Sequence, residues 1–360
     1  MPIMKKILCV AMFSPVVCAG HAAAADLSGV RLFGVADAAV SYSNGGDHTV
    51  KLNSGMGSTS RFGLAGTEDL GGGYTLSFLL ESAVGLDTGA AGGTTLQRDS
   101  SLFNREANIT LGSPRTGYLK LGRQYPAMMS LALDPFVGVS GFSPFTSIVG
   151  GNSDLGNGAS MGDSRISNAI SYTSMNLGGV TSQVLYAPRE RNDAGYHRTA
   201  DYGIEAHFAR GPLLYLGGQY NVVYTDPTAL VPAVKNIWSG VGVQYQLGAS
   251  TLGYSLNVIA PETAGSRVAQ NHMLSLVYQP QPRHTVQLAL MYRNVAGHHA
   301  LNSFTAGFGY SYNFSKTASV YTRIGGVLNN SEGISTLAAT PVSAAGNDVR
   351  VLALGLRKRF

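Results

Sequence analysis

The 360-residue chain has few charged residues, two cysteines and, beyond its first 25 residues, no long apolar run. Asp, Glu, Lys and Arg make up 12% of the residues, about half the usual proportion in soluble proteins. Because no later segment has 18 consecutive apolar residues, a helical membrane protein is excluded. Disorder is excluded as well, since 44% of the residues are hydrophobic. A β-rich protein remains, either a large soluble fold or a membrane barrel.

The N-terminus has the pattern of a secretory signal peptide. Two lysines precede an apolar stretch, and the small-residue run Ala22–Ala25 follows it. We therefore expect residues 1–25 to be a cleaved signal peptide and residues 26–360 to form a single barrel domain. Both cysteines, Cys9 and Cys18, lie in the removed segment. The rest of the chain has no thiol for a disulfide or a metal site.

Behind this segment, short stretches alternate between apolar and polar residues. Between residues 240 and 247, Val and Tyr alternate with Gly and Gln, and residues 251–258 and 285–293 alternate in the same way. A period of two is typical of a strand with one apolar and one polar face. In a soluble sandwich the apolar face would pack on a second sheet. In an outer-membrane barrel it would face lipid, and the polar face would line water.

The connections between these stretches favour the barrel. Seven tight turns alternate with eight longer polar segments, which gives fifteen connections and sixteen strands. The tight turns lie near residues 69–73, 113–117, 176–179, 209–212, 247–250, 280–283 and 315–317. The longer segments lie near residues 44–57, 85–101, 126–163, 188–199, 225–235, 261–270, 294–301 and 329–347. An even strand number with short turns on one side and long loops on the other is typical of a closed outer-membrane barrel.

Aromatic residues gather near the expected strand ends. They are Tyr172, Tyr186, Tyr220, Tyr224, Tyr278, Tyr292, Tyr310, Tyr312 and Phe314. We interpret them as girdles at the membrane interfaces, where an amphipathic ring is stable.

Five segments spread along the chain carry a resemblance to a known family: Val30–Asp37, Ser60–Gly73, Leu79–Ser82, Leu121–Tyr125 and Gly355–Phe360. With them the chain resembles the trimeric porins of beta-proteobacteria and Neisseria over its whole length after the signal peptide. The second segment, SRFGLAGTEDLGGG, is very specific. The resemblance implies an all-β, sixteen-stranded antiparallel transmembrane barrel whose third loop folds inward to narrow the pore.

The same resemblance implies a function and partners. We expect a homotrimer in the bacterial outer membrane, in contact with lipid and lipopolysaccharide. It would be a water-filled channel for passive diffusion of small hydrophilic solutes and ions. The terminal Phe360 resembles the signal that the barrel-assembly machinery reads. A substrate-selective channel is the close alternative.

The segment 126–163 is the longest connection, and it contains Asp134, Asp154 and Asp163 but no Lys or Arg. Unstructured loops longer than about 15 residues are usually functional. Folded into the lumen, this loop would face the charges of the wall. We expect Asp154 and Asp163, late in the loop, to lie near its return to the wall and away from the constriction.

Strand alternation supplies the wall charges. Arg61 points inward because its neighbours Phe62 and Leu64 share the lipid face. Arg165 points inward on the same argument, with Ser167 and Ser171 beside it and Ile166, Ile170 and Tyr172 facing lipid. Glu81 and Asp37 also fall on the inward parity of their strands.

Two further arginines are less regular. Arg105 matches a pore arginine of the family, which would turn Glu106 and Asn108 outward, an arrangement that requires cover from a neighbouring subunit. Arg123 lies at the top of its strand, just before the long loop. The predicted constriction therefore consists of Arg61, Arg105, Arg123, Arg165, Asp134, Glu81 and Asp37. Its positive excess predicts a weak preference for anions.

Other functions find little support. Residues 158–162 match G-x-S-x-G but lie in a Gly-, Ser- and Asn-rich loop, not between a strand and a helix. His298 and His299 are adjacent loop residues with no thiol or carboxylate cluster nearby, so we expect no metal site and no cofactor. The small, scattered net charge argues against nucleic acid. An enzyme is not expected, and an outer-membrane barrel hydrolase is the distant alternative.

Overall fold

The computed structural model describes residues 29–91, 101–136, 142–145, 152–156, 159, 164–189, 197–207, 211–223 and 234–360. The expected signal peptide, Tyr224, Asp163 and most of the G-x-S-x-G segment lie outside these residues.

The described residues form seventeen strands and three short 3-10 helices. The strands are β1 (Gly29–Asn44), β2 (His48–Ser54), β3 (Arg61–Gly71), β4 (Tyr74–Ala83), β5 (Glu106–Ser113), β6 (Gly117–Gln124), β7 (Ile166–Thr173), β8 (Val180–Ala187), β9 (His197–His207), β10 (Leu213–Val223), β11 (Val234–Leu247), β12 (Ser250–Glu262), β13 (Ala269–Gln281), β14 (His284–Val295), β15 (Ser303–Asn313), β16 (Ala318–Asn329) and β17 (Val349–Arg359). The 3-10 helices are η1 (Ala127–Ala132), η2 (Ser153–Leu155) and η3 (His299–Leu301). Within the described ranges, no helix is both long and apolar enough to cross a membrane.

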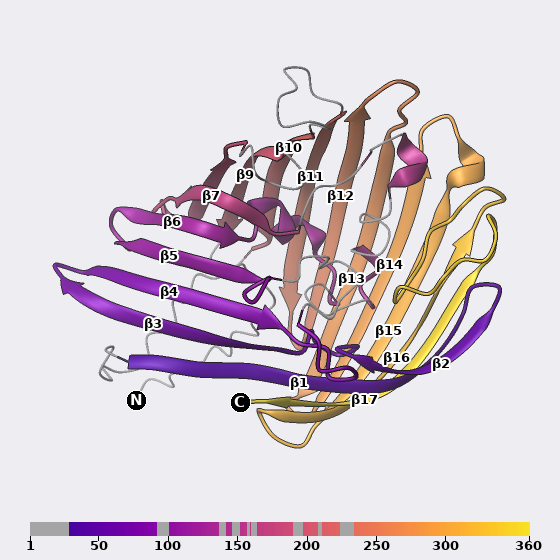
Figure 1. Cartoon of the computed structure of the whole chain (residues 1–360), viewed down its shortest axis with the longest axis horizontal. Helices are drawn as coiled ribbons and strands as arrows, with labels where there is room; N and C mark the ends of the chain where they lie inside the picture. Colours follow the sequence, from indigo (N-terminus) through magenta and orange to yellow (C-terminus); the bar gives the residue numbers. More distant parts are fainter. Residues whose placement is uncertain are drawn as a thin grey trace.

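The sheet closes on itself (Figure 1). Successive strands pair antiparallel, and β1 pairs with β17 from Val35 opposite Arg359 to Asn44 opposite Arg350. β2 and β3 both pair with the same side of β1, β2 along its second half and β3 along its first. They are therefore two segments of one wall strand, and the closed sheet has the sixteen strands that the connections predicted.

Six of the seven tight turns are confirmed; for example, β5 ends at Ser113 and β6 begins at Gly117. The turn near residues 209–212 lies partly outside the described residues. The first long segment, residues 44–57, is different, because it contains β2. This strand is joined to β1 by the turn at residues 45–47. Only Val50 and Leu52 are large apolar residues in it, so its composition resembles that of a loop. Pairing with β1 nevertheless makes it part of the wall.

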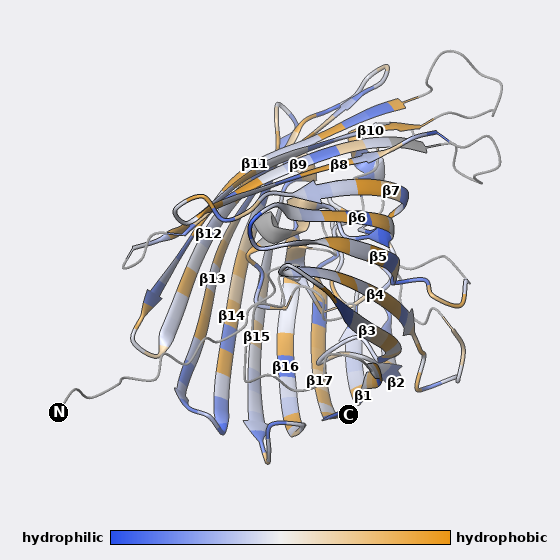
Figure 2. Ribbon diagram, turned by 90° about the vertical axis from the view of Figure 1, so that its left-hand side faces the viewer, coloured by the Kyte–Doolittle hydropathy of each residue, from blue (hydrophilic) through white to orange (hydrophobic). Residues whose placement is uncertain are grey.

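The outer face of the barrel is apolar. Val40, Leu352 and Leu354 are about half exposed or more, whereas their neighbours Ser41 and Ser43 are buried toward the lumen. Figure 2 shows the resulting bands of hydrophobic and hydrophilic residues along the strands. Several girdle aromatics are exposed as expected, namely Tyr172, Tyr186, Tyr278, Tyr292 and Phe314. An exposed apolar band of this kind suits a lipid environment.

The lumen face is not polar all the way round. On β10–β17 many inward residues are apolar, and they form one buried cluster with residues of the segment that follows β6. Phe136 and Phe142 meet edge to face with ring centroids 5.1 Å apart, and Phe145 lies 5.7 Å from Trp238. Phe136 approaches the wall closely at Gly309, where a Cβ would come within 2.8 Å of its ring. Burial of each large side chain here contributes about 1.5–3 kcal/mol.

Candidate arginine site in the lumen

Five neighbouring wall segments bring charged and aromatic side chains together on one side of the lumen. Arg61 begins β3, Glu81 lies near the end of β4, Arg105 precedes β5, Tyr125 follows β6 and Arg165 precedes β7. Glu81 pairs with Gly63 on one side and with Glu106 on the other, so the side chains of Glu81 and Glu106 lie on the same face of the sheet. Arg61, two residues before Gly63, shares that face. We call Arg61, Glu81, Arg105, Tyr125 and Arg165 the arginine cluster.

Glu81 and Tyr125 link the three arginines. The Arg61 Nε lies 3.1 Å from the Glu81 Oε2, and the Arg105 Nε donates to the Glu81 Oε1. The Arg105 Nη2 donates to the Tyr125 hydroxyl at 2.9 Å, and the Arg165 Nη2 donates to the same oxygen. The Arg165 guanidinium also stacks 4.3 Å from the centroid of the Tyr125 ring. These contacts fix the guanidinium groups in place.

The arginine cluster has more positive than negative charge. Glu81 is the carboxylate shared by Arg61 and Arg105, and Tyr125 is a neutral partner. Arg105 and Arg165 are 2% and 5% exposed, so their charges are poorly screened by bulk water. Glu106 adds a second buried carboxylate next to Glu81 in the register. Even with Glu106 counted, three guanidinium groups oppose two carboxylates.

The expected outward orientation of Glu106 and Asn108 is wrong. Ile109 and Leu111 are the exposed residues of β5, so Glu106 and Asn108 point inward, where both are buried. The alternation of β5 begins at Glu106 and does not extend back to Arg105, which precedes the strand. Arg105 and Glu106 can therefore both lie on the lumen side.

Arg123 is placed differently from the expectation. It pairs with Ala107 and shares the outward parity of Ile109 and Leu121. Its Nε donates to the Asn104 carbonyl at 2.9 Å, and its Nη1 donates to the Ser167 Oγ at 2.6 Å. The register thus separates Arg123 from the arginine cluster, although it lies only two residues from Tyr125.

A β-bulge changes the alternation at the start of β7. Asn168 has a φ of +56°, and the pairing skips from Ala169 opposite Gly122 to Ile166 opposite Gln124. As a result Ile166 is buried and Ser167 is exposed, the reverse of the expected orientations. Asn is one of the few residues that adopt a positive φ readily, so Asn168 is the residue in the sequence that could have indicated this bulge. Arg165 itself, before the bulge, is buried beside Tyr125 as described.

Asp37 lies on the lumen face but is held by its surroundings. Its carboxylate accepts hydrogen bonds from the Tyr321 hydroxyl and, at 3.1 Å, from the Gly57 N–H. Its backbone N–H donates to the Ser60 Oγ at 3.0 Å. Asp37 therefore holds the segment that connects β2 to β3, through its hydrogen bonds with Gly57 and Ser60. In the register it lies opposite Arg357.

Asp134 does not face the arginines. Its carboxylate accepts hydrogen bonds from the Ser143 Oγ at 2.6 Å and from the backbone N–H groups of Phe136 and Phe145 at 2.8 and 3.1 Å. Burial raises the pKa of Asp134 to about 6. This residue organises its own loop, which corrects its predicted place in the constriction.

The main loop anchor on the opposite wall was missed. Arg293 binds Asp154 through two bonds, Nη1 to Oδ2 at 2.8 Å and Nη2 to Oδ1 at 2.7 Å, and both side chains are buried. Arg267 donates to the Asp154 carbonyl at 2.7 Å. Arg293 has the same inward parity as Thr285 and Gln287, and this alternation could have indicated from the sequence that its side chain faces the lumen. Asp154 was expected near the loop's return to the wall, at β7, but these contacts attach it to β14 on the opposite wall.

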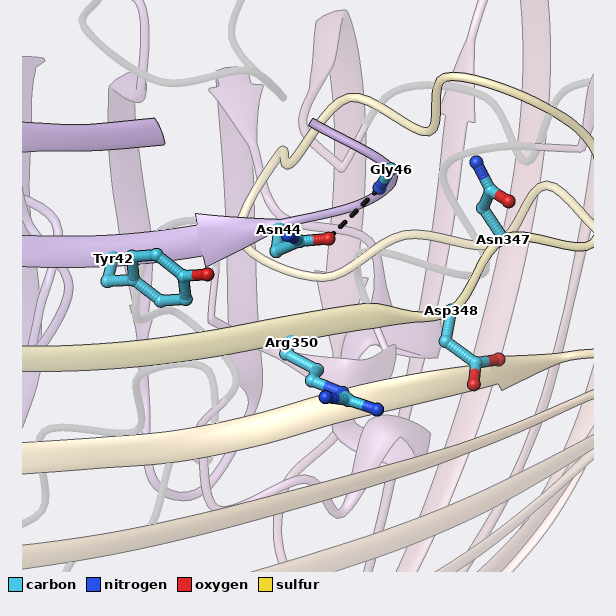
Figure 3. A pocket seen from close by; sticks show the side chains of 6 residues that line it. All are labelled: Tyr42, Asn44, Gly46, Asn347, Asp348 and Arg350. Atoms are coloured by element: carbon cyan, nitrogen blue, oxygen red, sulfur yellow. Dashed lines mark hydrogen bonds between the residues drawn. The ribbon is translucent and has the colours of Figure 1, made fainter. Parts of the chain in front are cut away.

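Other candidate sites are weaker. In the part of the chain that the structure describes, no three His, Cys, Asp or Glu side chains are grouped so that they could hold a metal ion. A shallow pocket lies at the long-loop end of the seam between β1 and β17 (Figure 3). It is lined by Tyr42, Asn44, Gly46, Asn347, Asp348 and Arg350. The Asn44 side chain accepts a hydrogen bond from the Gly46 N–H at 3.1 Å within it.

The closed sheet with its apolar outer face and charged lumen defines the class as an outer-membrane β-barrel. The description of the family model that matches residues 9–332 is Gram-negative porin. The chain therefore belongs to the Gram-negative porin family, and it is an outer-membrane protein.

Two curated relatives match part of the chain. Over 189 residues the chain is 36% identical to outer membrane porin protein 32 of Delftia acidovorans, covering 51% of this chain and 50% of that protein. It is 33% identical over 189 residues to an outer membrane porin protein of Bordetella pertussis, covering 47% and 45%. The matches thus span about half the length of these relatives.

Solved structures support the fold. The anion-selective porin from Comamonas acidovorans matches with a TM-score of 0.78 at 24% identity, over 92% of this chain and 99% of that one. The trimer form of OmpT from Vibrio cholerae matches with a TM-score of 0.67 at 16% identity, over 93% and 100%.

Proposed function

We propose that the protein forms a water-filled channel in the outer membrane, through which small hydrophilic solutes and ions diffuse passively with a weak preference for anions. The observation that carries this proposal is the arginine cluster on the lumen face, in which Arg61, Arg105 and Arg165 share Glu81 and Tyr125. Fixed positive charge beside a water-filled passage favours anions. The likeness to a protein described as an anion-selective porin supports the sign.

The loop after β6 supplies the second wall of the constriction in this proposal. Its described parts lie against β10–β17 through the apolar cluster and the Arg293–Asp154 pair. The passage then runs between the loop and the arginine cluster. At about 4–8 Å a net unit charge changes the energy of a passing ion by about 1 kcal/mol or less in water. The preference is therefore modest, and salt reduces it further.

Solute flux tests the channel directly. Liposomes containing the purified protein should swell in isotonic solutions of small neutral sugars, at rates that fall smoothly with sugar size. Absence of swelling with every small solute would contradict a channel. A single sugar that crosses far faster than others of its size, with saturation, would indicate the substrate-selective alternative. Ester hydrolysis by protein that conducts no ions would indicate the barrel hydrolase.

We extend the proposal to a homotrimer. The family resemblance and the trimeric form of one structural neighbour support it. The outward polar residues first expected at Glu106 and Asn108 give no support, because both point inward. Strands β5–β8 have eight residues each, against twelve to fourteen in β11–β14. We therefore assign the contact surface between subunits to the side of the barrel with the short strands β5–β8. Light scattering should give three times the chain mass, and a monomer that retains its β-sheet circular dichroism would contradict the trimer.

The remaining partners are outer-membrane lipid, lipopolysaccharide and the barrel-assembly machinery. Phe360 follows β17, exposes 59% of its surface, and exchanges backbone hydrogen bonds with Gly34 at 3.0 and 3.1 Å. An exposed aromatic side chain at the end of the last strand suits recognition by the assembly machinery. Deletion of Phe360 should reduce the yield in the outer membrane without blocking export across the inner membrane. A normal yield would contradict this role.

A further inference from the structure

Arginines continue beyond the arginine cluster toward the short-turn end of the barrel. Arg359 and Arg61 pair with opposite sides of Val35, and Arg357 precedes Arg359 by two residues on β17, opposite Asp37. Arg31 lies near the start of β1. All of these positions have the lumen parity of their strands. Leu32, next to Arg31, and Leu356, next to Arg357, face outward and are more than 60% exposed.

Asp37 lies opposite Arg357 in the register, but no carboxylate of the described residues forms a direct ion pair with Arg31, Arg357 or Arg359. The Arg357 Nη1 donates to the Gly57 carbonyl at 3.4 Å, and the Arg31 guanidinium lies 5.8 Å from the Phe33 ring centroid. We call Arg31, Arg357 and Arg359 the mouth arginines. Arg31 and Arg359 are exposed, and Arg357 is half-buried.

Two carboxylates face the same region, and each is engaged elsewhere. Asp37 accepts from Tyr321 and Gly57, and Asp69, at the turn between β3 and β4, accepts from the Gly71 N–H at 2.8 Å. The lumen face of the opposite wall carries amides near its short turns, including Gln244, Gln246 and Gln279. Positive charge therefore concentrates on one side of this mouth.

The spacing lets these charges act together. Neighbouring strands lie about 4.8 Å apart, and alternate residues along a strand lie about 6.8 Å apart. Arg357, Arg359 and Arg61 therefore follow one another at intervals near the Debye length, which is about 10 Å at 0.1 M salt. An anion that leaves Arg61 meets the field of Arg359 before it loses that of the arginine cluster.

We propose that the mouth arginines form a second anion-binding step between the constriction and the short-turn mouth. It would take small inorganic anions such as chloride and small carboxylates, which bind transiently to exposed guanidinium groups and then leave to bulk water. Weak binding at successive sites is compatible with conduction, because no single site holds the ion tightly. This step rests on the proposed function, since it presupposes an anion-conducting lumen.

The step makes the channel directional, and reversal potentials in KCl gradients test that. Charge at a mouth is least screened when the dilute solution is on that side. The anion-to-cation permeability ratio should be about twofold higher with dilute KCl at the short-turn mouth than with the gradient reversed. Orientation is fixed by Ala249→Cys in an exposed short turn, labelled from one side by an impermeant thiol reagent; residues 26–360 contain no other cysteine.

The variant R31Q/R357Q should equalise the two ratios while the mean anion preference persists. It leaves Arg359 in place, next to the terminal Phe360. The control R350Q removes one charge, as R31Q does, but from the outward face of β17 at its other end, and it should keep the twofold difference. The single variant R31Q should show a smaller loss of the difference and serves if the double variant does not insert.

Equal ratios in the unaltered protein, or an unchanged difference in both R31Q and R31Q/R357Q, would overturn the second step. In either case a persisting anion preference would leave the proposed channel intact. Absence of any anion preference in both directions would overturn the proposed selectivity as well. The two failures are therefore distinguishable.

Discussion

The lumen has two unlike sides, which Figure 1 places across the barrel from each other: β3–β7, and β11–β16. On the first side Arg61, Arg105 and Arg165 crowd around Glu81. On the second side Arg293 has Asp154 as its bidentate partner, and apolar residues surround the loop aromatics. The arginine cluster thus carries an excess of positive charge, which we propose sets selectivity, whereas the matched Arg293–Asp154 pair attaches the loop.

The comparison also explains why inward residues differ round the ring. Around the arginine cluster, inward positions are polar or charged. Where the loop packs on the wall, several inward residues are apolar, as at Trp238, Met273 and Met291. A lumen face that packs on protein follows the rules of a protein core.

The largest effect expected on the attachment side follows Arg293→Met. It leaves the buried Asp154 carboxylate without its bidentate partner, and breaking such a pair typically costs about 3–5 kcal/mol. The loop should loosen, so that single-channel current becomes noisier and larger in denaturant well below the unfolding midpoint of the barrel.

The matched control for Arg293→Met is Lys235→Met. Lys235 lies 3.4 Å from Glu262, with both side chains about half exposed, so its loss should cost at most about 1 kcal/mol. If both variants conduct like the unaltered protein, the Arg293–Asp154 pair does not hold the loop.

The loop should also respond to pH through Asp134. Its pKa in the folded protein, about 6, lies above the ordinary value of 3.8, so the folded state takes up a proton more readily than the unfolded one. The resulting stabilisation is fully present below about pH 3.8 and is lost as pH rises through about 6, with an upper size of about 3 kcal/mol. The difference in melting temperature between the unaltered protein and Asp134→Asn should change over this window. A difference that is constant from pH 4 to 7 would contradict the raised pKa.

A smaller loss of stability is expected from a change in the contact between Tyr321 of β16 and Gly355 of β17. A Cβ at Gly355 would lie 2.4 Å from the Tyr321 ring and hydroxyl, which cross this glycine to reach Asp37. Gly355→Ala should therefore displace Tyr321 and destabilise the barrel by about 1–3 kcal/mol in denaturant titrations. Gly29→Ala, where a Cβ meets no described atom within 4 Å, is the control. Equal unfolding midpoints for the two variants would show that Tyr321 adjusts without cost.

The sequence predicted the wall better than the site. Period-two alternation and turn residues located the short turns of the described residues, because each wall strand needs an apolar outer face. Glu106, Asn108 and Ser167 were misplaced because the irregular start of β5 and the bulge at Asn168 interrupt the alternation. Arg123 continues the regular outward alternation of Leu119 and Leu121, so the alternation of β6 itself indicates its position. The partners of Asp134 and Arg293 could not be predicted, because they depend on the fold of a loop with no periodic pattern.

The central claim is that the arginine cluster sets the ion preference, and the reversal potential of R61Q/R165Q in a KCl gradient tests it most directly. Arg123→Gln is the matched control, since this arginine has the outward parity of β6. The unaltered protein and R123Q should both favour anions modestly, by a few-fold at low salt, and R61Q/R165Q should lose or reverse that preference with its conductance retained. A cation preference in the unaltered protein, or an anion preference unchanged in R61Q/R165Q, would contradict the account.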